Sequence, residues 1–186
     1  MASDPPLNQA LHHVTTSLEE AGIPYMVTGS LASSIHGEPR TTQDIDIVIS
    51  PTTSTLTKFL NDFAEERFYV SPDAAHTALQ QRGMFNIIEF SSGWKIDLIV
   101  RKNRGFSLEE FERRLETEFE GMPLTIASPE DVILAKLEWA KAAGSTRQLD
   151  DVKSILRTLG NDLDRAYIER WVDELGVTEL WQQVNS

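Results

Sequence analysis

The sequence predicts an α+β fold in which strands and helices share one core and the chain ends in a helical region. Residues 25–50 have the pattern of a strand, a short helix and a second strand. Residues 84–100 contain two apolar runs separated by Ser91-Ser92-Gly93, which is typical of a β-hairpin. After residue 128 the apolar residues recur at helical spacing. We therefore expect a core over residues 1–127 and a helical region over residues 128–186 that packs on it.

The first half of the chain predicts alternating helices and strands. Leu7, Leu11, Val14 and Leu18 recur every three or four residues, so residues 7–20 should form an amphipathic helix. Strands are expected at 25–28 and 44–50, with a short helix at about 31–36 between them. A helix should begin at the Ser50-Pro51 pair and run to about residue 67. A short strand at 68–70 and a helix capped by Ser71 then lead to the hairpin.

The second half predicts mainly helices. Ser107 and Glu110 have the spacing of a capping box, and the helix that they begin should extend to about Phe119. A strand is expected at 124–126. The Ser128-Pro129 pair should begin a long apolar helix that ends at Gly144. Three further helices are expected at about 145–159, 163–175 and 179–184.

Composition limits the function classes. The chain has 186 residues, and its 17 Lys and Arg against 29 Asp and Glu give a formal net charge of −12. This charge argues against broad, sequence-independent nucleic-acid binding, although a local basic groove stays compatible with it. The lack of cysteine excludes disulfides and thiol nucleophiles. No signal peptide is recognisable and no apolar run approaches the roughly 20 residues that span a bilayer, so we expect a cytoplasmic protein without a membrane partner.

Two aspartates open the second strand. Asp44 and Asp46 alternate with Ile45 and Ile47, so both carboxylates project from the same face. Like charges at this spacing raise each other's pKa unless a cation lies between them. A solvent-exposed strand face is the alternative, but aspartate is depleted in strands. The pair therefore favours a divalent-cation site.

Three further charged features are ambiguous taken singly. Asp97 lies in the middle of an otherwise apolar strand, where an acidic residue can also serve to protect a sheet edge. The Arg101–Arg104 segment follows at once, either as a solvated loop or within reach of a phosphate chain held at Asp97. Lys136 lies inside an apolar helix, where it either extends to the surface beside Glu138 or meets an anion.

Taken in order, these residues resemble the signature of a known superfamily. Gly29-Ser30, then thirteen residues, then Asp44-x-Asp46, and later a single strand aspartate, is similar to the nucleotidyltransferase superfamily with the DNA polymerase beta type of fold. The segment that reads Leu-Ala-x-x-x-x-His-Gly-Glu-Pro-Arg-x-Thr-x-Asp-Ile-Asp resembles the small bacterial AbiEii-type toxins. The resemblance covers about residues 23 to 100 well, with a looser match over residues 136–151. It implies a mixed β-sheet flanked by helices, with residues 1–127 as the catalytic core.

The resemblance also implies a reaction and a set of site residues. The reaction would be metal-dependent transfer of a nucleoside monophosphate from a nucleoside triphosphate, with release of pyrophosphate. Asp44, Asp46 and Asp97 would bind Mg²⁺ or Mn²⁺, and Asp97 would also assist deprotonation of the acceptor. Gly29 would allow close approach of the phosphates, and Ser30 would donate to them at a helix N-terminus. The implied nucleotide-binding residues are Gly29, Ser30, Arg40, Thr42, Lys136 and Asp151, with Asp150 as the alternative to Asp151.

The acceptor stays open at this level. It is an RNA end such as tRNA, a protein side chain or a small hydroxyl compound, and a toxin would also imply an antitoxin partner. A non-catalytic nucleotide-binding or partner-binding module that retains the fold is the second hypothesis. The presence of all three aspartates favours the enzyme, because a module without catalysis has no need of them.

Overall fold

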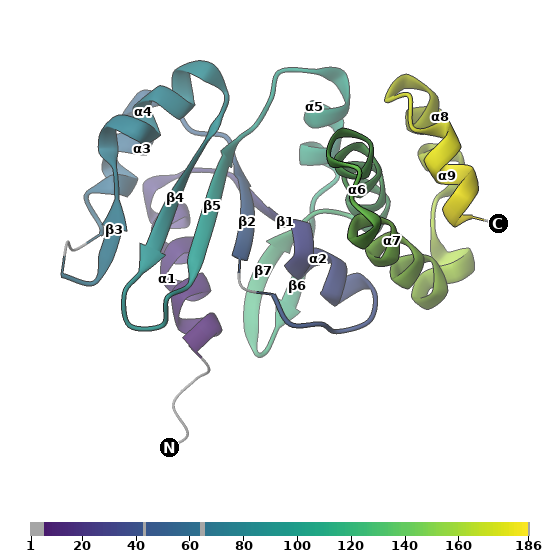
Figure 1. The fold of residues 1–186 in the computed structure, drawn as a ribbon. Helices are drawn as coiled ribbons and strands as arrows, with labels where there is room; N and C mark the ends of the chain where they lie inside the picture. The colour runs from purple at the N-terminus through teal and green to yellow at the C-terminus, as the bar shows by residue number, and fades with distance from the viewer. Residues whose placement is uncertain (1–5, 43, 64–65, 186) are drawn as a thin grey trace.

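A seven-stranded mixed β-sheet forms the centre of the protein (Figure 1). The computed structural model describes residues 6–42, 44–63 and 66–185. Along the sheet the strand order is β3-β4-β5-β2-β1-β7-β6; β2 pairs with β5 and β1 with β7 in parallel, and the other neighbours are antiparallel. The strands are β1 Tyr25–Thr28, β2 Asp44–Ile49, β3 Phe68–Val70, β4 Met84–Glu89, β5 Lys95–Val100, β6 Leu115–Phe119 and β7 Met122–Ile126.

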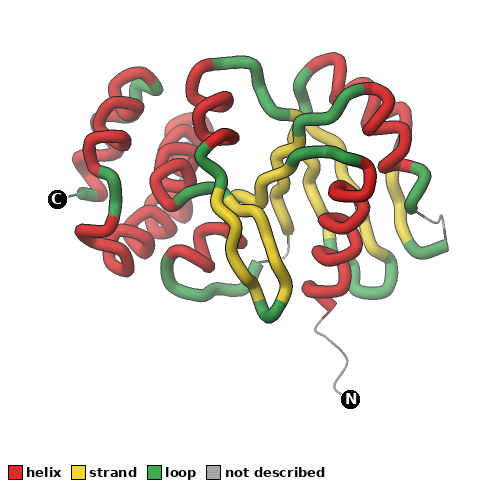
Figure 2. The backbone as a smooth tube through the Cα atoms, turned by 180° about the vertical axis from the view of Figure 1, so that it is seen from behind, coloured by secondary structure: helices red, strands yellow, loops and turns green. Residues whose placement is uncertain are grey.

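Helices cover both faces of this sheet, which confirms the predicted α+β class. The helices behind the sheet in Figure 1, which come to the front in Figure 2, are α1 Pro6–Ala21, α3 Thr53–Leu60 and α4 Pro72–Gln81. The remaining helices are α2 Gly29–His36, α5 Gly105–Glu112, α6 Pro129–Ala143, α7 Thr146–Leu159, α8 Arg165–Glu174 and α9 Thr178–Val184. Among the described helices, none is both long and apolar enough to cross a membrane.

The alternation of side chains along β2 divides the core between the two faces. Ile45, Ile47 and Ile49 point into one apolar cluster together with α1, α3 and α4. Val48 points the other way, into a second cluster formed largely by α5 to α9. By the same alternation, Asp44 and Asp46 project from the face of the sheet that carries Val48.

The helix expected from Ser50 to about residue 67 is shorter than predicted. It begins at Thr53, with Thr52 as N-cap, and ends at Leu60. The Thr52 hydroxyl accepts the amide of Thr55 at 3.2 Å, and the Thr55 hydroxyl accepts the amide of Thr52 at 2.9 Å. This reciprocal pair satisfies two amides at the helix start, so it overrides the Ser50-Pro51 signal.

The helix expected over residues 107–119 was wrong in its second half. The helix there, α5, begins at Gly105 and ends at Glu112, and β6 follows in antiparallel pairing with β7. Glu120 and Gly121, at φ 49° and 82°, form the tight turn between them. The apolar residues 115 and 119 fit helical spacing equally well, but the pairing partner that makes this segment a strand lies outside it.

Candidate active site

The candidate site lies on one face of the sheet, near the start of β2. The strand register places Asp46 opposite Thr28 of β1 on one side and opposite Asp97 of β5 on the other. Asp44 is exposed, Asp46 is half-buried and Asp97 is buried. The alternation predicted from sequence therefore holds, and the parallel pairing of β2 with β5 brings the third aspartate to the pair.

Gly29 lets the backbone approach the Asp46 carboxylate closely. The chain turns from β1 into α2 at this glycine, which has φ +64°. A Cβ atom at this position would lie 2.0 Å from Asp46 Oδ2 and 2.7 Å from its Cγ. Because no side chain fits there, only glycine permits the turn and the carboxylate to coexist.

Beside the aspartates, ion pairs and one hydrogen bond connect α2, the segment that follows it, α6 and α7. The Arg40 guanidinium donates two hydrogen bonds to the Asp151 carboxylate, both at 2.8 Å, and one to Ser30 Oγ, also at 2.8 Å. Lys136 Nζ donates to the same carboxylate at 2.7 Å. We call Ser30, Arg40, Lys136 and Asp151 the basic cradle. It carries two cations and one anion, so it has a net positive charge.

The basic cradle decides two questions that the sequence left open. Lys136 is only 4% exposed and meets an anion, so it does not extend to the surface beside Glu138. Asp151 is buried and contacts both cations, whereas Asp150 is exposed on the other side of the helix turn. The anion of the cradle is therefore Asp151.

Burial and neighbouring charges shift the protonation of these groups in opposite directions. Burial, together with the charges of Asp97 and Asp44, raises the pKa of Asp46, although Lys136 and Lys95 oppose the shift. Burial lowers the pKa of Lys136, and the nearby Arg40 adds to this effect, although Asp151 opposes it. Burial would raise the pKa of Asp151, but hydrogen bonds from Arg40 and Lys136 outweigh it and hold that pKa below its ordinary range.

The carboxylates fit a hard divalent cation only together with a substrate. Among the described residues, no group of three or more His, Cys, Asp or Glu side chains is arranged to enclose a metal ion. Asp97 Oδ1, however, is buried without a hydrogen-bond partner in the described part of the chain, and Asp46 is its neighbour in register. Mg²⁺ commonly takes one or two carboxylates and completes its shell with phosphates and water. Asp46 and Asp97 meet that requirement.

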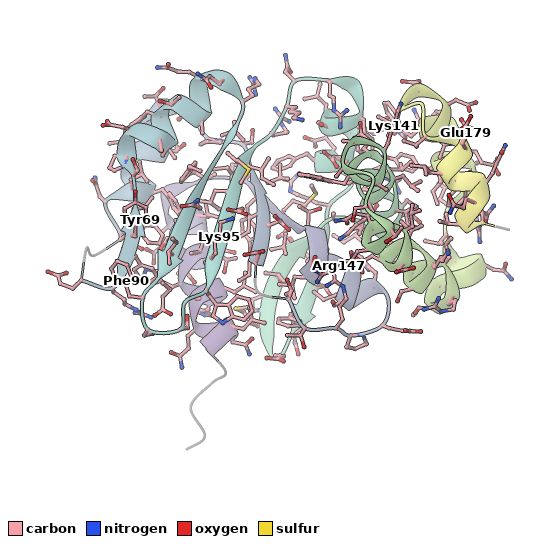
Figure 3. All side chains as sticks on the ribbon, in the orientation of Figure 1. Tyr69, Phe90, Lys95, Lys141, Arg147 and Glu179 are labelled. Atoms are coloured by element: carbon pink, nitrogen blue, oxygen red, sulfur yellow. The ribbon has the colours of Figure 1, made fainter. Side chains whose placement is uncertain are left out.

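Lys95 contacts the candidate site, although the sequence analysis assigned it no role. Its Nζ lies 2.8 Å from Asp97 Oδ2, and its side chain is 39% exposed. The hydrogen bond to Asp97 raises the pKa of Lys95. In Figure 3, Lys95 on β5 and Arg147 on α7 lie on opposite sides of β2. Side chains alternate between the two faces along β5, so Lys95 lies on the same face as Asp97. This spacing could have identified Lys95 from the sequence.

Two groups of residues lie differently from the sequence expectation. The Thr42 hydroxyl donates to the backbone oxygen of Asp44 at 2.9 Å, so it orders the entry into β2. The Arg101–Arg104 segment leaves the opposite end of β5, where Arg101 N bonds to the last residue of β2. Arg104 pairs there with Glu138. Of the two interpretations that the sequence left open, the solvated loop fits better, because half a strand separates this segment from Asp97.

Comparison with solved structures assigns the fold. The chain is similar to ANT(2")-Ia in complex with adenylyl-2"-tobramycin, with 13% identity, a TM-score of 0.62 and coverage of 97% of this chain and 98% of that one. It is similar to a putative nucleotidyltransferase from Thermotoga maritima, with 17% identity, a TM-score of 0.53 and coverage of 77% and 90%. Lincomycin-bound LnuA, a lincosamide antibiotic adenylyltransferase, shows 11% identity, a TM-score of 0.53 and coverage of 79% and 94%. The fold is that of the nucleotidyltransferases.

The family model narrows this assignment. Residues 7–180 match the model described as "Nucleotidyl transferase of unknown function (DUF2204)", and the chain belongs to this family. A search of curated proteins gave no match. The predicted superfamily is confirmed and the protein is a nucleotidyltransferase. The narrower resemblance to AbiEii-type toxins stays a prediction.

Proposed function

We propose that the protein transfers a nucleoside monophosphate from a nucleoside triphosphate to a small acceptor that carries a hydroxyl group. Asp46 and Asp97 would hold Mg²⁺ or Mn²⁺, with Asp44 as the further carboxylate that the resemblance implies. The observation that carries the proposal is the register pair of Asp46 and Asp97, with a free buried oxygen on Asp97, beside a positively charged cradle. Carboxylates for a metal and cations for phosphates are thus adjacent on one face of the sheet.

The basic cradle and the start of α2 supply the phosphate contacts. Arg40 is held in place by its paired hydrogen bonds to Asp151, so its guanidinium needs little further ordering to bind a phosphate. The N-cap residue of α2, Thr28, makes no side-chain cap bond. No cap side chain therefore occupies the first amides of α2. These amides and the Ser30 hydroxyl can donate hydrogen bonds to an anion.

The reaction is an in-line displacement at the α-phosphorus. The acceptor oxygen forms a bond to this phosphorus as the bond to the pyrophosphate oxygen breaks. The proton of the acceptor hydroxyl passes to the Asp97 carboxylate, while Arg40 and Lys136 stabilise the charge on the departing pyrophosphate. A divalent cation bound to the carboxylates supplies Lewis acidity and neutralises phosphate charge.

The similar structures support an adenylyl transfer to a small acceptor. ANT(2")-Ia is described with adenylyl-2"-tobramycin, and LnuA is an adenylyltransferase described with lincomycin. The net charge of −12 also weighs against an extended RNA acceptor. A toxin role with an antitoxin partner, implied by the AbiEii-type resemblance, stays a prediction that the same assays address through an RNA or protein acceptor.

The experiment compares thermal unfolding with and without nucleoside triphosphate and Mg²⁺, together with transfer of α-labelled nucleotide. We expect Mg²⁺-dependent stabilisation of the wild type, and loss of both stabilisation and transfer in Asp46→Ala without unfolding, because the variant removes a repelling carboxylate. Asp150→Ala is the matched control, since that aspartate is exposed. Nucleotide binding that needs neither Mg²⁺ nor Asp46 would instead identify the non-catalytic module.

A further inference from the structure

One half of the sheet face that carries the aspartates is open. In Figure 1 the near face of β3, β4 and β5 is not crossed by any helix among the described residues, whereas α2 lies to the right of β2 and packs against β1 and β2. Large apolar side chains lie exposed on this open half: Tyr69 of β3 and Met84 of β4 are both 52% exposed. Exposed apolar groups gathered on one face mark a binding surface more often than an isolated one does.

Strand register makes this open half continuous with the catalytic carboxylates. One row runs across four strands from Tyr69 through Ile88 and Lys95 to Asp44. The next row runs from Asn86 through Asp97 to Asp46.

A third row places Met84 beside Ile99. We call Tyr69, Met84, Asn86 and Ile88 the platform. It begins one strand away from Asp97.

In-line displacement requires the attacking oxygen and the departing pyrophosphate to lie on opposite sides of the α-phosphorus. The basic cradle lies on the β1 side of Asp46, toward α2 and α7, because Arg40 binds Ser30 of α2 and Asp151 of α7. If the pyrophosphate departs toward that side, the attacking oxygen must come from the opposite one. Asp97 lies on that opposite side, and the platform is what extends beyond it.

We propose that the platform binds the acceptor of the transfer reaction, and that the acceptor is a small, uncharged molecule with an apolar ring and a hydroxyl group. This inference rests on the function proposed above. Tyr69 and Ile88, which are paired in register, supply an apolar surface for the ring, and Met84 lies on the same face beyond Asn86. The Asn86 amide, opposite Asp97 in register, orients the hydroxyl toward the carboxylate that accepts its proton.

The charges of the face select this class over the alternatives. None of the four platform residues is charged, and the adjacent cation, Lys95, is neutralised by Asp97 at 2.8 Å. A polycationic acceptor would need carboxylates beyond those that bind the metal, and the platform has none. An RNA acceptor would need several cations along its path, but the Arg101–Arg104 segment leaves the far end of β5.

The test measures transfer from an α-labelled nucleoside triphosphate to 4-nitrophenyl glucoside, to tobramycin and to a short oligoribonucleotide with a free 3′-hydroxyl. We expect label on the neutral aryl glycoside. Tyr69→Ala and Ile88→Asp should raise the KM for this acceptor about 10-fold or more while leaving the KM for the triphosphate unchanged. Trp139→Ala is the matched control, since Trp139 is a 64% exposed aromatic residue on α6, outside the platform.

Each other outcome is decisive. Label on tobramycin or on RNA alone, or an acceptor KM that does not change in the two platform variants, overturns the assignment. If Mg²⁺ and triphosphate stabilise the protein and tobramycin is labelled, but 4-nitrophenyl glucoside is neither labelled nor bound, the acceptor class is wrong while the proposed function stands. If triphosphate and Mg²⁺ have no effect on the melting temperature, the proposed function itself fails. Melting curves of both variants without ligand verify that they fold.

Discussion

Removing the shared anion of the basic cradle should destabilise the protein far more than removing either cation. In Asp151→Ala, Lys136 keeps its buried position, at 5% side-chain exposure, but loses its carboxylate partner at 2.7 Å. Arg40 also loses both of its hydrogen bonds to Asp151, but its side chain is 26% exposed and can turn toward water. The cost therefore falls mainly on the ammonium group of Lys136.

The magnitude follows from what a buried, unpaired lysine can do. Breaking a buried ion pair by removing one partner typically costs about 3–5 kcal/mol. Loss of the proton limits this cost, because each pKa unit corresponds to about 1.4 kcal/mol and lysine titrates near 10.4 when unfolded. For a chain of this size, we expect a melting temperature about 6–20 °C lower at pH 7.

Three companion variants isolate the cause. Lys136→Met should cost only about 1–2 kcal/mol, because Arg40 still satisfies Asp151. The double variant Lys136→Met with Asp151→Leu should recover most of the stability lost in Asp151→Ala, since both charges of the buried pair are removed together. Asp150→Ala should be neutral. The assay is urea unfolding of all four variants, with nucleotide absent.

The pH dependence gives an independent check. In Asp151→Ala the folded-state pKa of Lys136 lies below its unfolded value, so the unfolded state binds more protons and the stability of the variant rises with pH. The deficit relative to wild type should therefore shrink as pH increases from 7 toward 10. A deficit below about 1 kcal/mol, or a double variant no more stable than Asp151→Ala, would refute the reasoning, because both require an unpaired buried charge.

Three further predictions concern other parts of the chain. Gly29→Ala should abolish nucleotide-dependent stabilisation, because its Cβ would collide with the Asp46 carboxylate. Gly93→Ala is the control: its φ is +72° and nothing lies within 4 Å of the new Cβ, so melting curves should show only a backbone cost of about 1–3 kcal/mol. Burial and a nearby aspartate raise the pKa of Glu110 from 4.5 to about 7. Glu110→Gln should therefore gain up to about 3 kcal/mol over wild type at pH 8, and the gain should vanish below pH ~4.5, where both folded and unfolded states are protonated; a gain independent of pH would contradict this. Thr52→Ala should lower the free energy of unfolding by about 1 kcal/mol in chemical unfolding, and Ser50→Ala should change it almost not at all. A larger loss in Ser50→Ala would show that Ser50 caps the helix, as the sequence predicted.

Much of the candidate site was accessible from local pattern. Alternation placed Asp44 and Asp46 on one face, and the apolar neighbours of Asp97 marked it as unusual within its strand. The glycine at position 29 was expected to permit close approach, although to a phosphate, and the structure adds that the Asp46 carboxylate occupies the space of its missing Cβ. These predictions rest on backbone geometry over a few residues, which local sequence controls.

The misassigned segments share a physical reason. Residues 115–119 fit a helix by spacing, yet they form β6, because backbone hydrogen bonding to β7 stabilises an extended conformation. The basic Arg101–Arg104 segment follows Asp97 in sequence, which left open whether it is a solvated loop or lies near the phosphates. Strand direction carries it to the far end of β5, away from Asp97. Neither outcome depends on the residues of the segment alone.

The sequence by itself determined which side chains share a strand face and which residue types are present for metal and phosphate chemistry. Only the tertiary structure decided that Asp46 lies opposite Asp97 in the strand register and that Lys136 forms its ion pair with Asp151 rather than with Asp150. It also decided that Lys95 forms an ion pair with Asp97 beside an open face. These are contacts between elements far apart in the chain. Their partners are selected by strand register and by the cost of burying unpaired charge, neither of which a local pattern contains.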